Sequence, residues 1–175
     1  MDTKNKFNLF LPGISSETND NVSLIAVDLR EKKTVIGLYI SENRTVYLKM
    51  EKSYETKEFS SFSEIVNQFI EENSLDNISK IAVAVPGPVI GGKSAPARLP
   101  WVLDAEEIKN STNIAQVFLI NDLEASAYGL EHVSEENFVT IHDSDYFTPG
   151  NAVLLSPGEG LGEAALFWDG SFLRP

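Results

Sequence analysis

Two acidic groups and one glycine-rich turn in this sequence have the residue types and positions of a binding or catalytic site. Asp28 ends the apolar run VSLIAVDL and precedes four consecutive charged residues, REKK. Asn121-Asp122 ends a second apolar run, AQVFLIND, and the turn PGEGLGEA follows at residues 157–164. A carboxylate at the end of a strand can take up a proton as a general base. From local sequence alone, Asn121-Asp122 is equally suited to capping the helix that follows it.

Apolar periodicity predicts the elements that position these residues. Alternating runs predict three consecutive antiparallel strands over 22–29, 34–41 and 44–50, with a short turn at Glu42-Asn43. Apolar residues spaced by three and four predict a helix from Phe62 to Ile70, capped by Ser60 or Ser61. The elements expected next are a strand over 78–85, a short helix capped by Asp104, a strand over 115–122 and a helix over 123–130.

This order of elements predicts an α/β fold. A meander followed by crossover helices gives a mixed five-stranded sheet with an antiparallel meander and flanking helices. Further apolar runs at 137–141, 151–156, 163–168 and 171–175 predict additional strands. Residues 1–21 are expected to form an N-terminal arm, and its apolar side chains could pin it to the body: Phe7, Leu9, Phe10 and Leu11.

Composition excludes several classes of function. The chain has 175 residues, of which 42% are hydrophobic and 23% charged, which is typical of one soluble domain. A net charge of −12 argues against nucleic acid or an anionic membrane as a partner. There is no cysteine, no signal peptide pattern and no apolar run of membrane-spanning length, so we expect a cytoplasmic protein.

The ordered motifs from Val22 to Pro175 resemble the bacterial glucokinase family, in the sugar-kinase and actin-like ATPase superfamily with its ribonuclease H-like lobes. The most specific pieces are IND at 120–122 and PGEGLGEA at 157–164. Between the two aspartates, the segment AVAVPGPV is followed by GG and then LPW, in the order of the family. Each piece alone would be weak, but their order along the predicted elements makes the resemblance specific.

The resemblance implies a role for each acidic group. Asp122 would be the general base for the 6-hydroxyl of a hexose, with glucose as the expected sugar, and Asn121 would hydrogen-bond the sugar. The cofactors implied are ATP and Mg²⁺, with Asp28 helping to organise the metal. Phosphoryl transfer of this kind needs an oriented nucleophile and a metal-bound triphosphate.

The two phosphate loops implied by the resemblance carry charged substitutions. Gly158, Gly160 and Gly162 correspond to one phosphate loop, or alternatively form an ordinary β-turn, and Glu159 stands where the family has threonine. In the first loop, the family pattern Asp-x-Gly-Gly-Thr is replaced by Asp28-Leu29-Arg30-Glu31-Lys32. Our hypothesis is that Arg30 or Lys32 pairs with Glu159, in the space that phosphates would fill. The alternative is that residues 30–33 form a solvated turn.

Other departures bear on the activity of the chain. Arg98 stands before LPW, where the family carries asparagine. The family continues into a Glu-Gly-Gly-His segment and a second lobe, so residues 22–175 are expected to be the N-terminal lobe, with the C-terminal lobe absent. Two functions follow as alternatives: the N-terminal domain of a glucokinase-type ATP:hexose 6-phosphotransferase, or a non-catalytic module with a disabled nucleotide site and a regulatory or assembly role. A third alternative is an actin-like lobe that binds no ligand. A homodimer is a further possibility.

Overall fold

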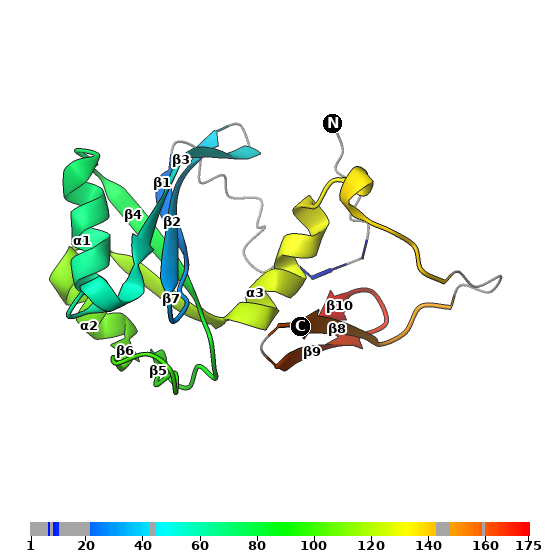
Figure 1. Ribbon diagram of the computed structural model, residues 1–175. Coiled ribbons are helices and arrows are strands. Elements are labelled where there is room, and N and C mark those ends of the chain that lie inside the picture. The colour runs from blue at the N-terminus through cyan, green and yellow to red at the C-terminus, as the bar shows by residue number, and fades with distance from the viewer. Residues whose placement is uncertain (1–6, 8, 11–21, 43–44, 143–147, 159) are drawn as a thin grey trace. The chain divides into compact units, whose positions relative to one another are not determined.

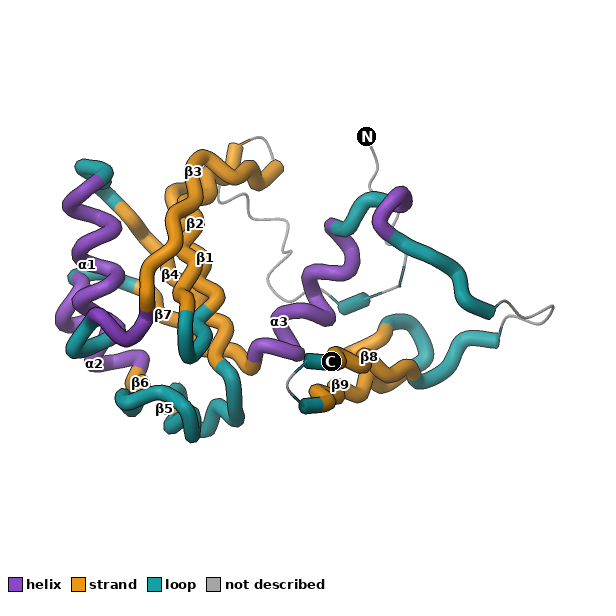
Figure 2. Tube along the Cα trace, in the orientation of Figure 1, coloured by secondary structure: helices purple, strands orange, loops and turns teal. Residues whose placement is uncertain are grey.

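The computed structural model describes residues 7, 9–10, 22–42, 45–142, 148–158 and 160–175. The chain forms two compact units, one over residues 15–122 and the other over residues 123–175 together with residues 1–14. Figure 1 labels the helices and strands, and Figure 2 marks the same trace by secondary structure. The expected division into an arm over 1–21 and a lobe over 22–175 stays a prediction.

A mixed five-stranded sheet forms the centre of the first unit, with the strand order β3-β2-β1-β4-β7. Its strands are β1 (Val22–Asp28), β2 (Lys33–Glu42), β3 (Thr45–Glu55), β4 (Ile78–Val85) and β7 (Gln116–Asn121). The pairs β1–β2 and β2–β3 are antiparallel, whereas β1–β4 and β4–β7 are parallel. The predicted α/β fold, with its meander and its mixed sheet, is confirmed.

Strand β3 is longer than the sequence predicts. It continues to Glu55 rather than ending near residue 50, because β2 pairs with it from Glu42 opposite Thr45 to Lys33 opposite Glu55. The apolar alternation fades after Met50, so only the partner strand reveals the extension. The predicted turn residue Asn43 lies outside the described residues.

Helices α1 (Phe62–Glu72) and α2 (Ala105–Thr112) cover one face of this sheet (Figure 1). The Ser61 side chain accepts a hydrogen bond from the Glu64 amide, and the Asp104 carboxylate accepts one from the Glu106 amide, so both predicted caps are confirmed. The core between helices and sheet is aliphatic and aromatic, and its fully buried members include Ile25, Ile36, Ile65, Val66, Phe69, Ile81, Val83 and Val85.

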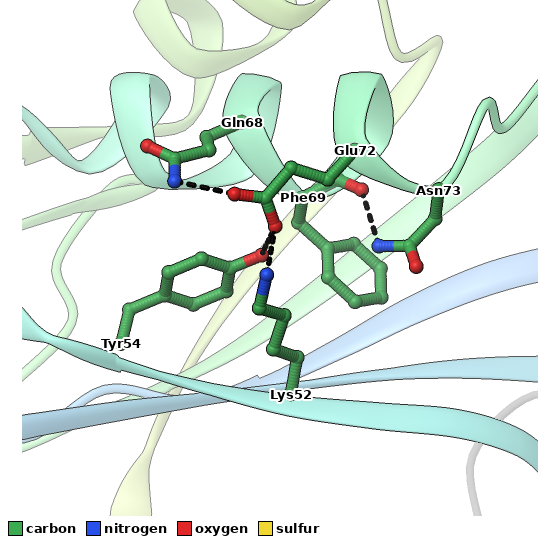
Figure 3. Close-up of polar contacts among 6 residues, drawn as sticks. All are labelled: Lys52, Tyr54, Gln68, Phe69, Glu72 and Asn73. Carbon is green, nitrogen blue, oxygen red and sulfur yellow. Dashed lines mark hydrogen bonds and ion pairs between the residues drawn. The ribbon is translucent and has the colours of Figure 1, made fainter.

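Polar contacts attach the end of α1 to β3 (Figure 3). The Glu72 carboxylate pairs with the Lys52 ammonium and accepts hydrogen bonds from the Tyr54 hydroxyl at 3.1 Å and the Gln68 amide at 2.6 Å. The Lys52 hydrogen bond is the main reason that the pKa of Glu72 lies below its ordinary value. Burial, followed by the hydrogen bond to Glu72, raises the pKa of Tyr54.

The second unit contains α3 (Asp122–Gly129), which begins at the last residue of the first unit, and a three-stranded antiparallel sheet. The strands are β8 (Ala152–Pro157), β9 (Leu161–Trp168) and β10 (Leu173–Arg174). The strand expected over 137–141 is wrong: Asn137 ends a short 3-10 turn, and Val139 and Ile141 are exposed. A strand needs a hydrogen-bonded neighbour, and among the described residues this run pairs with none.

The N-terminal segment packs on this second unit. Leu9 is 1% exposed and bridges to Leu173 in parallel, and the Phe10 amide donates to the Leu173 carbonyl at 2.9 Å. The Phe7 amide donates to the Glu131 carboxylate at 2.8 Å. The expected attachment is thus confirmed for Phe7, Leu9 and Phe10, while Leu11 lies outside the described residues.

Asp169 closes the turn between β9 and β10. Its carboxylate accepts hydrogen bonds from the amides of Phe172 at 2.8 Å and Ser171 at 2.9 Å, and from the Arg174 guanidinium at 2.5 Å. These hydrogen bonds, of which the one from the Phe172 amide has the largest effect, lower the pKa of Asp169 to about 2.

Among the described helices of the chain, none has the length and apolar character that a bilayer crossing requires.

Candidate functional site

The carboxyl ends of β1, β4 and β7 meet at one edge of the sheet in the first unit. Asp28 lies opposite Ala84 on β4, and Val85, the next residue of β4, lies opposite Asn121 on β7. Neighbouring strands are about 4.8 Å apart, so Asp28 and Asn121 stand roughly 10 Å apart across β4. Asp122 follows Asn121 directly as the first residue of α3. Asp28, Asn121 and Asp122 therefore share one edge, as parallel pairing requires.

A hydrogen bond across this edge orients Asn121. Its side-chain nitrogen Nδ2 donates to the Gly87 carbonyl at 2.9 Å, in the loop that follows β4. Gly87 has a φ of +143°, which a residue with a side chain rarely adopts. Because the amide nitrogen is directed at this loop, the position of the Asn121 carbonyl oxygen is defined as well.

The loop between β4 and α2 carries the LPW segment and is tied down at its base. Two short strands, β5 (Lys93–Ser94) and β6 (Leu103–Asp104), pair within it (Figure 2). The Lys93 ammonium lies 2.6 Å from the Asp104 carboxylate, which also caps α2. Leu99 and Leu103 are buried in the core, and Trp101 packs against it. The loop is therefore an ordered part of this edge.

Arg30 binds the carboxylate of Asp28 with two contacts. Its Nη2 lies 2.7 Å from Oδ2 of Asp28, and its Nε donates to Oδ1 at 3.1 Å. Residues two apart in an extended chain point to the same side, so this pair follows from the backbone at the end of β1. The hydrogen bond and the charge of Asp28 raise the pKa of Arg30, and the charge of Asp122 adds a smaller contribution. Arg30 thus lies within electrostatic reach of both acidic groups.

A buried threonine pair holds the backbone of the charged turn. The Thr56 hydroxyl donates to the Arg30 carbonyl at 2.8 Å, and the Thr56 amide donates to the Lys32 carbonyl at 2.9 Å. Because the only hydroxyl proton of Thr56 goes to Arg30, the Thr34 hydroxyl must donate to Thr56 across their 2.8 Å contact. Both threonines are fully buried. Buried hydrogen bonds from Thr56 therefore fix the backbone of the charged turn, and the sequence did not indicate this contact.

The remaining charges of the turn are also engaged. The Lys57 ammonium lies 3.1 Å from the Glu31 carboxylate. This hydrogen bond is the main reason that the pKa of Glu31 lies below its ordinary value, and Arg98 and Lys32 contribute through their charge. Arg98, the departure from the family before LPW, therefore lies close enough to Glu31 for its charge to lower the pKa of that carboxyl. The alternative of a solvated turn agrees with the exposure of Arg30, Lys32 and Lys33, and the structure adds that Arg30 and Glu31 also have ion-pair partners.

The predicted glycine loop lies in the second unit. It joins β8 to β9, and the Gly158 amide donates to the Gly160 carbonyl at 2.8 Å. Gly162 belongs to β9, and a Cβ added there would lie 2.9 Å from a methyl carbon of Leu123. Close packing is thus one reason for glycine at this position. Glu159 lies outside the described residues, so its pairing with Arg30 or Lys32 stays a prediction.

The glucokinase family model matches residues 25–174 of this chain. Among curated proteins, the glucokinase of Trichormus variabilis is 28% identical over 150 residues, which are 85% of this chain and 44% of the relative. The glucokinase of Synechocystis is 31% identical over 153 residues, 81% of this chain and 43% of the relative. The chain therefore spans less than half the length of these relatives.

Solved structures show the same fold. The glucokinase of an Antarctic psychrotroph matches with a TM-score of 0.73 at 19% identity, over 87% of this chain and 48% of the other. The glucokinase of Balamuthia mandrillaris, solved in complex with glucose, matches with a TM-score of 0.62 at 19% identity, over 92% of this chain and 48% of the other. Both belong to the group of sugar kinases with the actin-like ATPase fold.

Proposed function

Because the chain belongs to the glucokinase family, we propose that the edge bearing Asp28, Asn121 and Asp122 is the hexose-binding side of a glucokinase-type site. The observation that supports this most is the convergence of Asn121-Asp122 and the Gly87 loop at the ends of adjacent parallel strands. Open α/β sheets bind their ligands at this edge. Glucose is the hexose we propose, since a structural relative was solved with glucose bound.

In this proposal the two neighbouring residues have different roles. Asp122 accepts a hydrogen bond from the 6-hydroxyl of the sugar and takes its proton as the general base when phosphoryl transfer occurs. A positioned base typically contributes about 10²–10⁴-fold to the rate. Asn121 offers its carbonyl oxygen to a second sugar hydroxyl, because its amide nitrogen is already donated to Gly87.

The nucleotide side of the proposed site is the glycine loop between β8 and β9. The loop bearing Gly158, Gly160 and Gly162 would supply backbone N–H groups to the phosphates of ATP, and the Gly158 amide would have to leave the Gly160 carbonyl to take part. The residues at the metal position do not fit Mg²⁺, because both oxygens of Asp28 contact the Arg30 guanidinium. Mg²⁺ needs carboxylate oxygens at about 2.0–2.1 Å in a near-octahedral shell.

The second candidate is a non-catalytic, sugar-binding module, and the Arg30–Asp28 pair is the observation that favours it. Sugar kinases complete their sites by closing two lobes over the substrates. Since the relatives are more than twice as long as the matched part of this chain, we propose that catalysis requires a further lobe. In both candidates the hexose lies on the same residues.

Titration calorimetry with glucose tests the shared part of the proposal. We expect saturable binding by the whole chain and a weaker interaction for Asp122→Asn and Asn121→Ala. Asp76→Asn, which removes an exposed acid in the loop before β4, is the matched control and should bind as the unmodified chain does. Equal binding by Asp122→Asn would refute the assignment. Production of glucose 6-phosphate from ATP and Mg²⁺, assayed with this chain joined to the C-terminal part of a glucokinase relative, would then decide between the two candidates.

A further inference from the structure

Arg30 and Asp28 form a pair in which one guanidinium contacts both oxygens of one carboxylate. The Nη2–Oδ2 distance is 2.7 Å and the Nε–Oδ1 distance is 3.1 Å, so each carboxylate oxygen has its own guanidinium nitrogen. Two parallel contacts of this kind are the strongest geometry that arginine offers to a carboxylate. A metal ion at the same oxygens would have to lie against a positive charge.

The backbone that carries Arg30 is held at three points. The Leu29 amide donates to the Ala84 carbonyl at 3.0 Å, which extends the β1–β4 pairing past Asp28. Thr56 donates to the Arg30 carbonyl through its hydroxyl and to the Lys32 carbonyl through its amide. These contacts direct residues 28 and 30 to the same side of the chain. The pair is therefore a consequence of the fold at this edge.

We infer that Arg30 is a built-in cation at Asp28 that takes the place of a divalent metal, so that this carboxylate holds no metal ion while Arg30 is present. The exclusion of a metal from Asp28 rests on the geometry alone. Among the described residues, three or more carboxylates or histidines do not gather into an alternative metal site. A single substitution of Arg30 should then release Asp28 for a divalent cation.

Binding of Mn²⁺ alone, measured through the electron paramagnetic resonance signal of free Mn²⁺, tests this inference on the whole chain. The side chains of Arg30 and Asp28 are 73% and 39% exposed, so the pair itself is modest in energy. Loss of such a pair corresponds to a gain of up to about fivefold in Mn²⁺ affinity for Arg30→Ala. Arg30→Gln serves as a second variant where circular dichroism shows that the alanine variant is not folded.

Two controls separate a local effect from a general loss of positive charge. Lys33→Ala removes a cation from the same turn and should leave Mn²⁺ affinity almost unchanged. Asp28→Asn combined with Arg30→Ala should lose the gain, because the oxygens that bind the metal are no longer a carboxylate. Equal Mn²⁺ affinity of the unmodified chain and Arg30→Ala would overturn the inference, as would a gain that persists in the double variant.

The Mn²⁺ titration contains no sugar and no nucleotide. Its result therefore judges the role of Arg30 even where glucose fails to bind and the proposed function falls.

Discussion

Substitution of the buried threonine pair tests how the charged turn is held. Thr56→Val removes the hydroxyl that donates to Arg30 and that accepts from Thr34, and leaves the Thr34 hydroxyl buried without its acceptor. A hydrogen bond contributes about 1 kcal/mol net, and an orphaned buried hydroxyl costs about 1–3 kcal/mol, so we expect a loss of about 2–4 kcal/mol. Thr34→Val leaves the Thr56–Arg30 bond intact and should cost about 1 kcal/mol.

The double variant is the decisive comparison. Adding Thr34→Val to Thr56→Val removes the orphaned hydroxyl, so the double variant should be more stable than Thr56→Val alone. Urea unfolding followed by Trp101 fluorescence reports on the first unit, with Trp168→Phe as the background that removes the only other tryptophan. The reasoning is refuted if Thr34→Val destabilises more than Thr56→Val, or if the two substitutions are additive.

Three further predictions concern the second unit. Leu9→Ala should lower its stability by about 2–3 kcal/mol, since Leu9 is 1% exposed in a small cluster, and a change below 1 kcal/mol in urea unfolding would contradict the packing. Gly162→Ala should cost about 1 kcal/mol by crowding Leu123, whereas Gly160→Ala, with nothing within 4 Å of its added Cβ, should be almost neutral in the same assay. The pKa of Asp169 is lowered from its ordinary value of 3.8 to about 2, so its carboxylate contributes its full stabilisation at a pH above 3.8. That stabilisation is lost as the pH falls through 2. The stability difference between the unmodified chain and Asp169→Asn should therefore shrink from pH 4 to pH 2, and an NMR titration giving an ordinary pKa for Asp169 would contradict it.

Local signals were sufficient where a segment is defined by its own residues. The strand over 78–85 was predicted with its observed bounds, because its second half is an apolar run that ends at Pro86. The caps at Ser61 and Asp104 follow from short side chains that reach the next turn. The Arg30–Asp28 pair could have been predicted in the same way, because residues two positions apart in an extended chain point to the same side.

The predictions that depend on a partner strand, namely the end of β3 and the strand over 137–141, were wrong. The end of β3 is determined by its pairing with β2, and the apolar run over 137–141 forms no strand although its composition favours one. β-propensity describes how well side chains fit a half-buried sheet, so it has no effect where no neighbouring strand exists. For this reason the order of the three meander strands was predicted correctly, whereas the length of β3 was not.

The sequence by itself determined the order of elements, the family and the candidates Asp28, Asn121 and Asp122, because periodicity and motif order are properties of the chain. Tertiary structure decided what those residues contact. The Asn121–Gly87 bond joins residues 34 apart, and the Thr34–Thr56 bond joins residues 22 apart. Such contacts exist only once parallel pairing has aligned the strand ends and burial has excluded water from the hydroxyls, and neither condition is written in any local stretch of sequence.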